Sequence, residues 1–173
     1  MKKLFAVLTS ILIMTNMQAQ NSNDDIVKEW QRAKNYTKEY LDAMPETGYS
    51  LKPTKEMRSF AAQFLHLSDA IYGFIAAATD EKSPVGFGEL EKSNDVNKTS
   101  VTNKVMAAYD FAINAIKKYP KENLPQQVKM FGRFEMSKLQ AIEKCFEHQT
   151  HHRGQATVYL RLAGATPPAE KLF

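Results

Sequence analysis

The residues in this chain best suited to chemistry are its histidines. The chain has four histidines, and three of them lie close together at His148, His151 and His152. An α-helix turns about 100° per residue, so His148 and His152 fall about 40° apart on one helix face, one turn above the other. Two imidazoles in that arrangement can bind one metal ion, whereas His151 lies about 60° to the other side of His148. The spacing predicts a pair of metal ligands.

The fourth histidine, His66, lies in the middle of a second predicted helix. Its own face carries small residues, among them Ala62, Ala70 and Gly73, so an inward-facing imidazole there would border a hollow. Together with His148 and His152 it would supply three nitrogen ligands from two helices and leave coordination positions open. Open positions are typical of catalytic metal sites, and three imidazoles suit zinc, nickel, copper and iron.

Other polar residues near these histidines have alternative interpretations. If water is the nucleophile, the candidate catalytic bases are Asp69, close to His66, and His151. A closed structural site would instead recruit His151 or Cys145 as its fourth ligand. In a third alternative no metal binds and the histidines are structural, since a pair four residues apart also occurs on solvated helix faces. The sequence contains no His-Glu-x-x-His motif, so a zincin is not indicated.

The helix that carries the histidine pair has further informative positions. Gln155 and Tyr159 share the face of the pair and could hydrogen-bond to its imidazoles. Arg153 is expected to be a solvated charge or to pair with a carboxylate of a neighbouring helix. Gly154 in mid-helix predicts a close backbone approach, because glycine there costs about 1 kcal/mol relative to alanine.

Length and composition limit the class of protein. The chain has 173 residues, 43% of them hydrophobic and 24% charged, which is typical of one globular domain. Its single cysteine excludes an internal disulfide and a Cys-x-x-Cys redox pair. The net charge is +4, and removal of a leader containing Lys2 and Lys3 would lower it to about +2, so nucleic-acid binding is not indicated.

Residues 1–19 resemble a secretory signal peptide. Lys2 and Lys3 precede an apolar run from Leu4 to Met14, and Ala19 provides a small residue for cleavage. The apolar run is shorter than the roughly 20 residues that span a membrane, so we expect cleavage rather than anchoring. The sequence therefore predicts a periplasmic or secreted protein with one domain at residues 20–173.

Hydrophobic spacing predicts four helices and no strand, hence an all-α four-helix bundle. The last helix is expected to bury Ile142, Val158 and Leu162 and to end at Gly164. The predicted helices are Asp24–Met44, a second helix capped by Thr54 and ending at Thr79, Ser100–Tyr119 and Phe134–Leu162, with a long loop at Asp80–Lys98 and an ambiguous connection at Lys121–Gly132.

These residues together resemble the DinB/YfiT-like superfamily. The resemblance lies in the segment Phe60–Ile71 around His66 and in the last helix. The motif there is His148-x-x-His151-His152-Arg153-Gly154-Gln155, followed by Tyr159-Leu160-Arg161-Leu162-x-Gly164 and Pro167-Pro168. It implies a four-helix bundle with a divalent metal, zinc or nickel, held by His66, His148 and His152, and His151 outside the ligand set. Activities in the superfamily include thiol-dependent S-transferases and isomerases that use bacillithiol or mycothiol, and relatives often form homodimers.

The sequence thus leads to two main hypotheses of function. The first is an exported metal-dependent enzyme, a hydrolase or a thiol-dependent transferase, that acts on a small molecule. It predicts an open metal position and a pocket beside Ala62, Ala70 and Gly73. Export would separate the protein from cytosolic thiols, which bears on the transferase alternative. The second is a non-enzymatic metal-binding or ligand-binding protein of the cell envelope, with a complete protein coordination sphere and no substrate cavity.

Overall fold

The computed structural model describes residues 23–173 of the chain. The predicted signal peptide, residues 1–19, lies outside the described residues, so export stays a prediction. Within residues 23–173, no helix has both the length and the hydrophobicity of a membrane-spanning segment.

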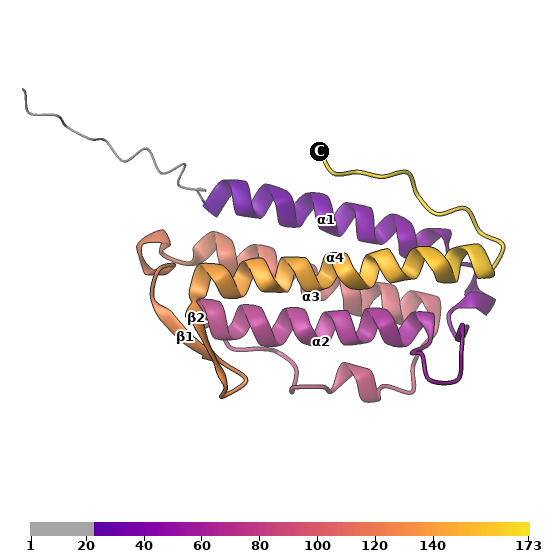
Figure 1. Cartoon of the computed structure of the whole chain (residues 1–173), viewed down its shortest axis with the longest axis horizontal. Helices are drawn as coiled ribbons and strands as arrows, with labels where there is room; N and C mark the ends of the chain where they lie inside the picture. The colour runs from indigo at the N-terminus through magenta and orange to yellow at the C-terminus, as the bar shows by residue number, and fades with distance from the viewer. Residues whose placement is uncertain (1–22) are drawn as a thin grey trace, which may run out of the picture.

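In this described part, four long helices run side by side along the longest axis of the molecule (Figure 1). They are α1 (Asn23–Ala43), α2 (Phe60–Thr79), α3 (Lys98–Lys118) and α4 (Lys138–Leu162). α2 packs against α3 and α4, and α1 packs against the same two helices. Helices α1 and α2, consecutive in sequence, therefore lie diagonally across the bundle. The predicted all-α four-helix bundle is confirmed.

Polar caps set the starts of three helices. Ser59, Asn97 and Ser137 precede α2, α3 and α4, and each side chain accepts a hydrogen bond from a backbone N–H in the first turn. The predicted cap of the second helix, Thr54, is wrong. The N–H of Phe60 instead donates to a carbonyl of the preceding segment, so the chain folds back on the helix start before the helix begins.

A short β-hairpin joins α3 to α4, contrary to the prediction of no strand. Strands β1 (Gln127–Met130) and β2 (Phe134–Ser137) pair antiparallel. The turn between them has positive φ at Phe131 (51°) and Gly132 (67°), a conformation that suits a tight hairpin. Residues 134–137, predicted as the start of the last helix, therefore belong to a strand, because Ser137 caps α4 only after the hairpin closes.

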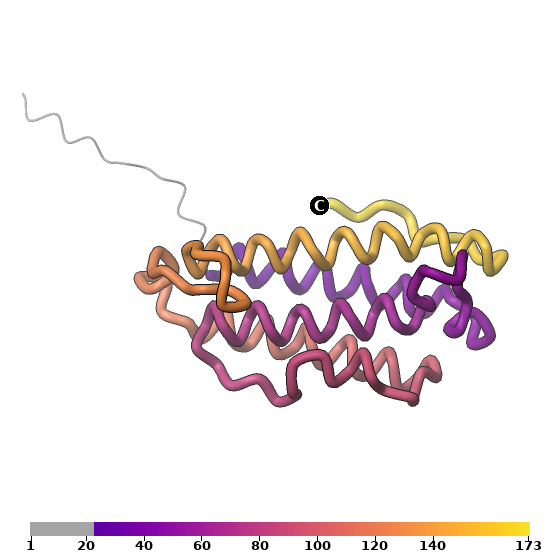
Figure 2. Tube along the Cα trace, turned by 60° about the horizontal axis from the view of Figure 1, so that its bottom comes forward, coloured from indigo at the N-terminus to yellow at the C-terminus, as the bar shows by residue number. Residues whose placement is uncertain are grey.

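The predicted long loop between the second and third helices is confirmed. It runs back along α2 (Figure 2), and its single turn of 3-10 helix, η2 (Leu90–Lys92), contacts α2. Two other short 3-10 helices are η1 (Glu46–Gly48) and η3 (Lys121–Asn123).

The buried face of α4 differs in part from the predicted one. Ile142 is buried as predicted, but Val158 and Leu162 are 52% and 58% exposed. Polar residues occupy inward-facing positions of this helix. The hydrophobic spacing therefore predicted the wrong buried face for its last two turns. Gly154 has no neighbour within 4 Å of an added Cβ, so the predicted close approach is absent there. Gly164 ends the helix with φ of 74°, as predicted.

Arg153 is buried rather than solvated, and its hydrogen-bond partners are neutral. Its Nη1 donates to Gln149 Oε1 at 2.8 Å and to Thr37 Oγ1 at 3.3 Å, and its guanidinium lies 4.6 Å from the centre of the Tyr36 ring. The buried hydroxyl of Tyr109 bonds to the same Gln149 and Thr37 oxygens, at 2.8 Å each. This network connects α1, α3 and α4 inside the core.

We predict that Tyr109→Phe lowers the free energy of unfolding by about 1–2 kcal/mol, because it removes two buried hydrogen bonds. Urea unfolding measures the change. Tyr72→Phe is the matched control, since Tyr72 is also a buried tyrosine on the bundle but lies outside this network. Equal effects of the two substitutions would contradict the prediction.

Candidate metal centre

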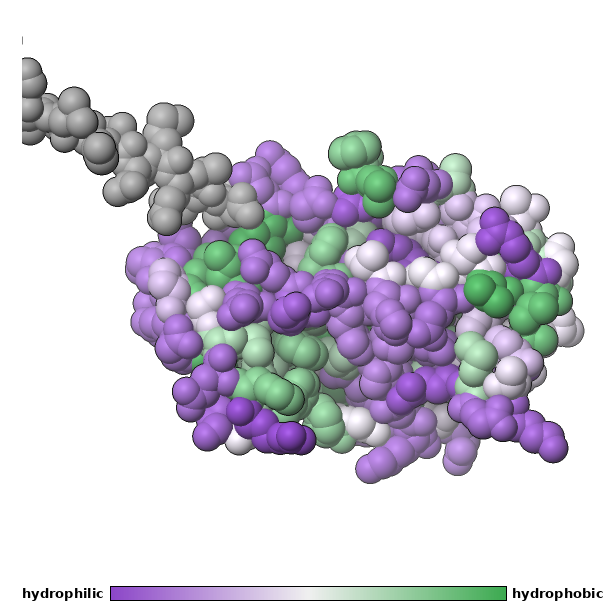
Figure 3. Space-filling model, in the orientation of Figure 1, coloured by the Kyte–Doolittle hydropathy of each residue, from purple (hydrophilic) through white to green (hydrophobic). Residues whose placement is uncertain are grey.

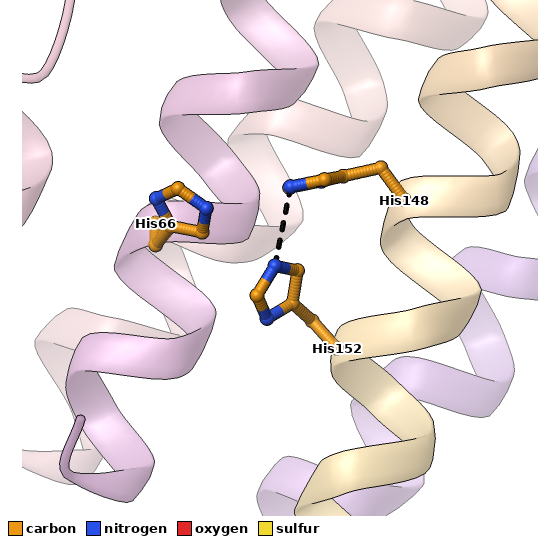
Figure 4. Close-up of side chains that lie close together, drawn as sticks. All are labelled: His66, His148 and His152. Carbon is orange, nitrogen blue, oxygen red and sulfur yellow. Dashed lines mark hydrogen bonds between the residues drawn. The ribbon is translucent and has the colours of Figure 1, made fainter. Parts of the chain in front are cut away.

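Helices α2 and α4 bring together the three histidines predicted as metal ligands. His66 comes from α2, and His148 and His152 come from the facing side of α4 (Figure 4). One nitrogen of each lies within 4.8 Å of the others, and the ring centres are 4.4–5.2 Å apart. His152 is buried, and the other two are half-buried. The cluster thus faces the boundary between the core and solvent.

A chain of hydrogen bonds determines which nitrogen of His152 carries the proton. The Tyr159 hydroxyl donates to the Arg58 carbonyl, and Gln63 Nε2 donates to Tyr159 and to Gln155 Oε1. These bonds orient the Gln63 amide so that its Oε1 accepts from His152 Nδ1 at 2.7 Å. The Nε2 lone pair of His152 is therefore directed into the cluster, as metal ligation requires.

The paired nitrogens of His148 and His152 fit a metal ion. Their Nε2 atoms are 3.1 Å apart, and tetrahedral zinc with bonds of about 2.0–2.1 Å places its nitrogen ligands about 3.3 Å from one another. Burial, followed by the neighbouring histidines, lowers the pKa of His148 to about 4 and that of His152 to about 3. Both are thus neutral near pH 7. Buried His148 Nδ1 has no hydrogen-bond partner in the described residues.

Glu91 orients the third imidazole. Its carboxylate lies 3.0 Å from His66 Nδ1 and accepts from Arg58 Nε at 3.0 Å. Partial burial acts to raise the pKa of Glu91, but the bonds and charges of His66 and Arg58 outweigh it and hold this pKa below its ordinary value. A carboxylate on the far nitrogen of a ligand histidine fixes the ring and strengthens ligation.

The candidate base Asp69 holds the Glu91 loop in place. Its carboxylate accepts the backbone N–H groups of Leu90 and Glu91, at 3.2 and 2.8 Å. Burial raises the pKa of Asp69, and these two hydrogen bonds partly offset the effect. Asp69 therefore positions Glu91, and through it His66.

The other candidate residues lie outside the cluster. His151 is exposed, its Nε2 lies 2.7 Å from Gln155 Nε2, and its ring packs edge-on against that of His152 with the ring centres 5.0 Å apart. Cys145 is fully buried, and burial raises the pKa of its thiol. Neither belongs to the group of side chains that the described structure brings within metal-binding distance.

A cavity of about 270 Å³ opens beside the cluster. Ala70 lines it as predicted, but Ala62 and Gly73 do not, and the ring of Phe87 lies 3.6 Å from where a Cβ of Gly73 would be. Its walls are His66, Asp69, Ala70, Phe74, Phe87, Gly88, Glu91, Phe131 and His148. A larger cavity of about 310 Å³ between α1 and α4 contains none of the predicted site residues.

Three residues that contact the ligand histidines were not predicted from the sequence, namely Arg58, Gln63 and Glu91. Gln63 lies three residues before His66 on the same helix, so the helical spacing could have indicated it. Glu91 lies in the long loop, where nothing in the sequence distinguishes it from the other acidic residues nearby.

We predict that Gln63→Ala weakens zinc binding by about tenfold, because the Nδ1 proton of His152 loses its acceptor. Competition with a chromophoric chelator measures the dissociation constant. Gln140→Ala is the matched control, because Gln140 is an exposed glutamine in the first turn of α4 and does not contact the histidines. Equal zinc affinity in the Gln63 variant and the parent would contradict the role assigned to Gln63.

The lowered pKa values also predict how acid affects the metal-free protein. Between pH 6.5 and about 4, His148 and His152 take up protons in the unfolded chain but stay neutral in the fold. The free energy of unfolding therefore falls as the pH falls, by roughly 2 kcal/mol for each histidine between pH 7 and pH 5. Urea unfolding at both pH values measures this loss. The His148→Ala/His152→Ala variant should lose much less stability, and an unchanged loss would contradict the pKa values.

Comparisons with known proteins agree with this fold. A DinB-like protein from Bacillus cereus has 19% identity and a TM-score of 0.75, over 86% of this chain and 97% of that one. The DinB-like protein YjoA from Bacillus subtilis has 19% identity and a TM-score of 0.68, over 84% and 95%. A search of curated proteins finds no match. The sequence model of the DinB family matches residues 17–172. The chain therefore belongs to the DinB family.

Proposed function

We propose that this protein is an exported metal-dependent enzyme, a hydrolase or a thiol-dependent transferase, that acts on a small molecule. It binds one divalent ion, zinc or nickel, through His66, His148 and His152. Membership of the DinB family supports the metal, and the apolar leader at residues 1–19 supports export. A bound divalent ion would lower the pKa of a coordinated water and polarise a substrate oxygen or sulfur.

The observation that carries the proposal is the position of the three imidazoles beside an open cavity. Three protein ligands leave at least one coordination position free in a tetrahedral site. His66 and His148 form part of the cavity wall, so that free position can be reached by a small molecule. A purely structural ion would instead be enclosed by four protein ligands.

The remaining side chains of the site position these ligands. Gln63 holds His152 in the tautomer with a free Nε2, and Glu91 holds the ring of His66. Asp69 fixes the backbone from which Glu91 projects. Its two carboxylate oxygens are already engaged by backbone N–H groups, so we assign Asp69 a positioning role and leave the general base unassigned.

The non-enzymatic alternative needs a fourth protein ligand, and the described structure offers neither of the two candidates. The His151 imidazole is bonded to Gln155, and Cys145 is enclosed in the core away from the cluster. The geometry therefore favours an open site.

Elemental analysis of protein purified without a chelator or a metal-affinity column tests the proposed site. We expect about one equivalent of divalent metal in the parent and none in the His148→Ala/His152→Ala variant. His151→Ala is the control and should keep its metal, because His151 lies outside the cluster. No metal in the parent, even after incubation with zinc and nickel, would overturn the proposal.

Turnover tests the enzymatic part of the proposal. Release of the phenol from activated phenyl esters is measured with and without an added low-molecular-weight thiol, since acyl transfer to water and to a thiol both release it. Metal-dependent turnover without thiol indicates a hydrolase, and turnover only with thiol indicates a transferase. In either case the double histidine variant should be inactive. Activity that survives in that variant would contradict catalysis at this centre.

A further inference from the structure

Three phenylalanines from separate parts of the chain meet at the cavity beside the histidines. Phe74 comes from α2, Phe87 from the loop before η2, and Phe131 from the turn of the hairpin. The Phe131 ring is 5.1 Å from that of Phe74 and 6.1 Å from that of Phe87. Phe74 also lies 6.4 Å from the ring of His148. Hydrophobic surface is visible where the hairpin meets α2 (Figure 3). An aromatic wall thus leads directly to the imidazoles.

Two of these phenylalanine rings are exposed to water, which is unfavourable for an apolar side chain. Phe87 is 79% exposed and Phe131 is 49% exposed, although each is large enough to stabilise a core if buried. Phe131 also has a φ of 51°, a conformation that bulky residues rarely adopt. Neither the packing of the core nor the turn geometry calls for phenylalanine at these positions. Exposed apolar residues grouped around a cavity indicate a binding surface.

The charges around the cavity indicate that the far part of a ligand is neutral. Among its described lining residues there is no lysine or arginine that could bind a phosphate or a carboxylate. The two carboxylates of the wall are engaged, Asp69 by backbone N–H groups and Glu91 by Arg58 and His66. The wall opposite the imidazoles is therefore apolar and aromatic.

The volume is sufficient for a ring. An apolar cavity of about 150 Å³ holds benzene, and this cavity has about 270 Å³. We infer that it is a subsite for an aromatic or comparably bulky, uncharged apolar group of the substrate. The metal-binding end of that substrate would lie at the three histidines, so the inference rests on the proposed function and specifies its substrate class.

Two hydroxamates with different side groups test this subsite in the zinc-loaded protein. Phenylacetohydroxamate and acetohydroxamate share the same metal-binding group, and only the first carries a ring. Isothermal titration calorimetry should show at least tenfold tighter binding of phenylacetohydroxamate. Phe87→Ala and Phe131→Ala should each reduce this ratio below threefold and leave acetohydroxamate binding and zinc content unchanged. Equal affinities of the two probes in the parent would overturn the inference.

Phe134→Ala is the matched control. Phe134 is an exposed phenylalanine of the same hairpin, but it does not line the cavity. The control should keep the affinity ratio of the parent. A decrease as large as that in Phe131→Ala would show that the hairpin, rather than the aromatic wall, determines binding, and would also overturn the inference.

A metal-free arm separates this inference from the proposed function. 4-Fluorotoluene carries a ring but no metal-binding group, and its ¹⁹F signal should broaden with the metal-free parent and much less with Phe87→Ala. If the parent binds no zinc, the proposed function fails and this arm alone decides whether the aromatic subsite exists. If zinc binds but the two hydroxamates have equal affinities and the 4-fluorotoluene signal does not broaden, the proposed subsite is wrong and the proposed metal centre is unaffected.

Discussion

The hydrogen bond from His152 Nδ1 to Gln63 Oε1 is the interaction on which the rest of the site depends. It joins α4 to α2 inside the bundle, about one helical turn from His66 on α2. It also fixes the tautomer of His152 and thereby the direction of the Nε2 lone pair of that ring. The Gln63 amide can serve in this way only because Tyr159 and Gln155 accept its two N–H groups.

Helix α4 carries polar groups on two inward-facing regions, and these have different tasks. Arg153 and Gln149 hold the Tyr109 network, which connects α1 and α3 to α4. Buried His152 hydrogen-bonds through both ring nitrogens, to Gln63 and to His148, whereas the buried Nδ1 of His148 has no partner in the described residues. Incomplete satisfaction of buried polar groups costs stability and is typical of functional sites. The bundle thus places its buried hydrogen-bond network and its histidine cluster on the same helix.

Much of the fold and the centre of the site could be predicted from the sequence, because both rest on helical spacing. The pairing of His148 with His152 follows from the turn of the helix, and the choice of His66 follows from its small neighbours. The hairpin was missed because its strands are four residues each, too short for a clear hydrophobic alternation. The exposed Val158 was misplaced because polar side chains take the inward positions of α4. Glu91 depends on how a long loop returns to α2, which no local pattern encodes.

The account holds that three imidazoles bind one ion and leave a position open toward an aromatic cavity. X-ray absorption spectroscopy of the zinc-loaded protein tests this most directly, because it reports the number and type of atoms around the metal. We expect three imidazole nitrogens at about 2.0–2.1 Å together with one or two oxygens from water. A sulfur at about 2.3 Å, or a fourth imidazole, would show a closed structural site and contradict the account.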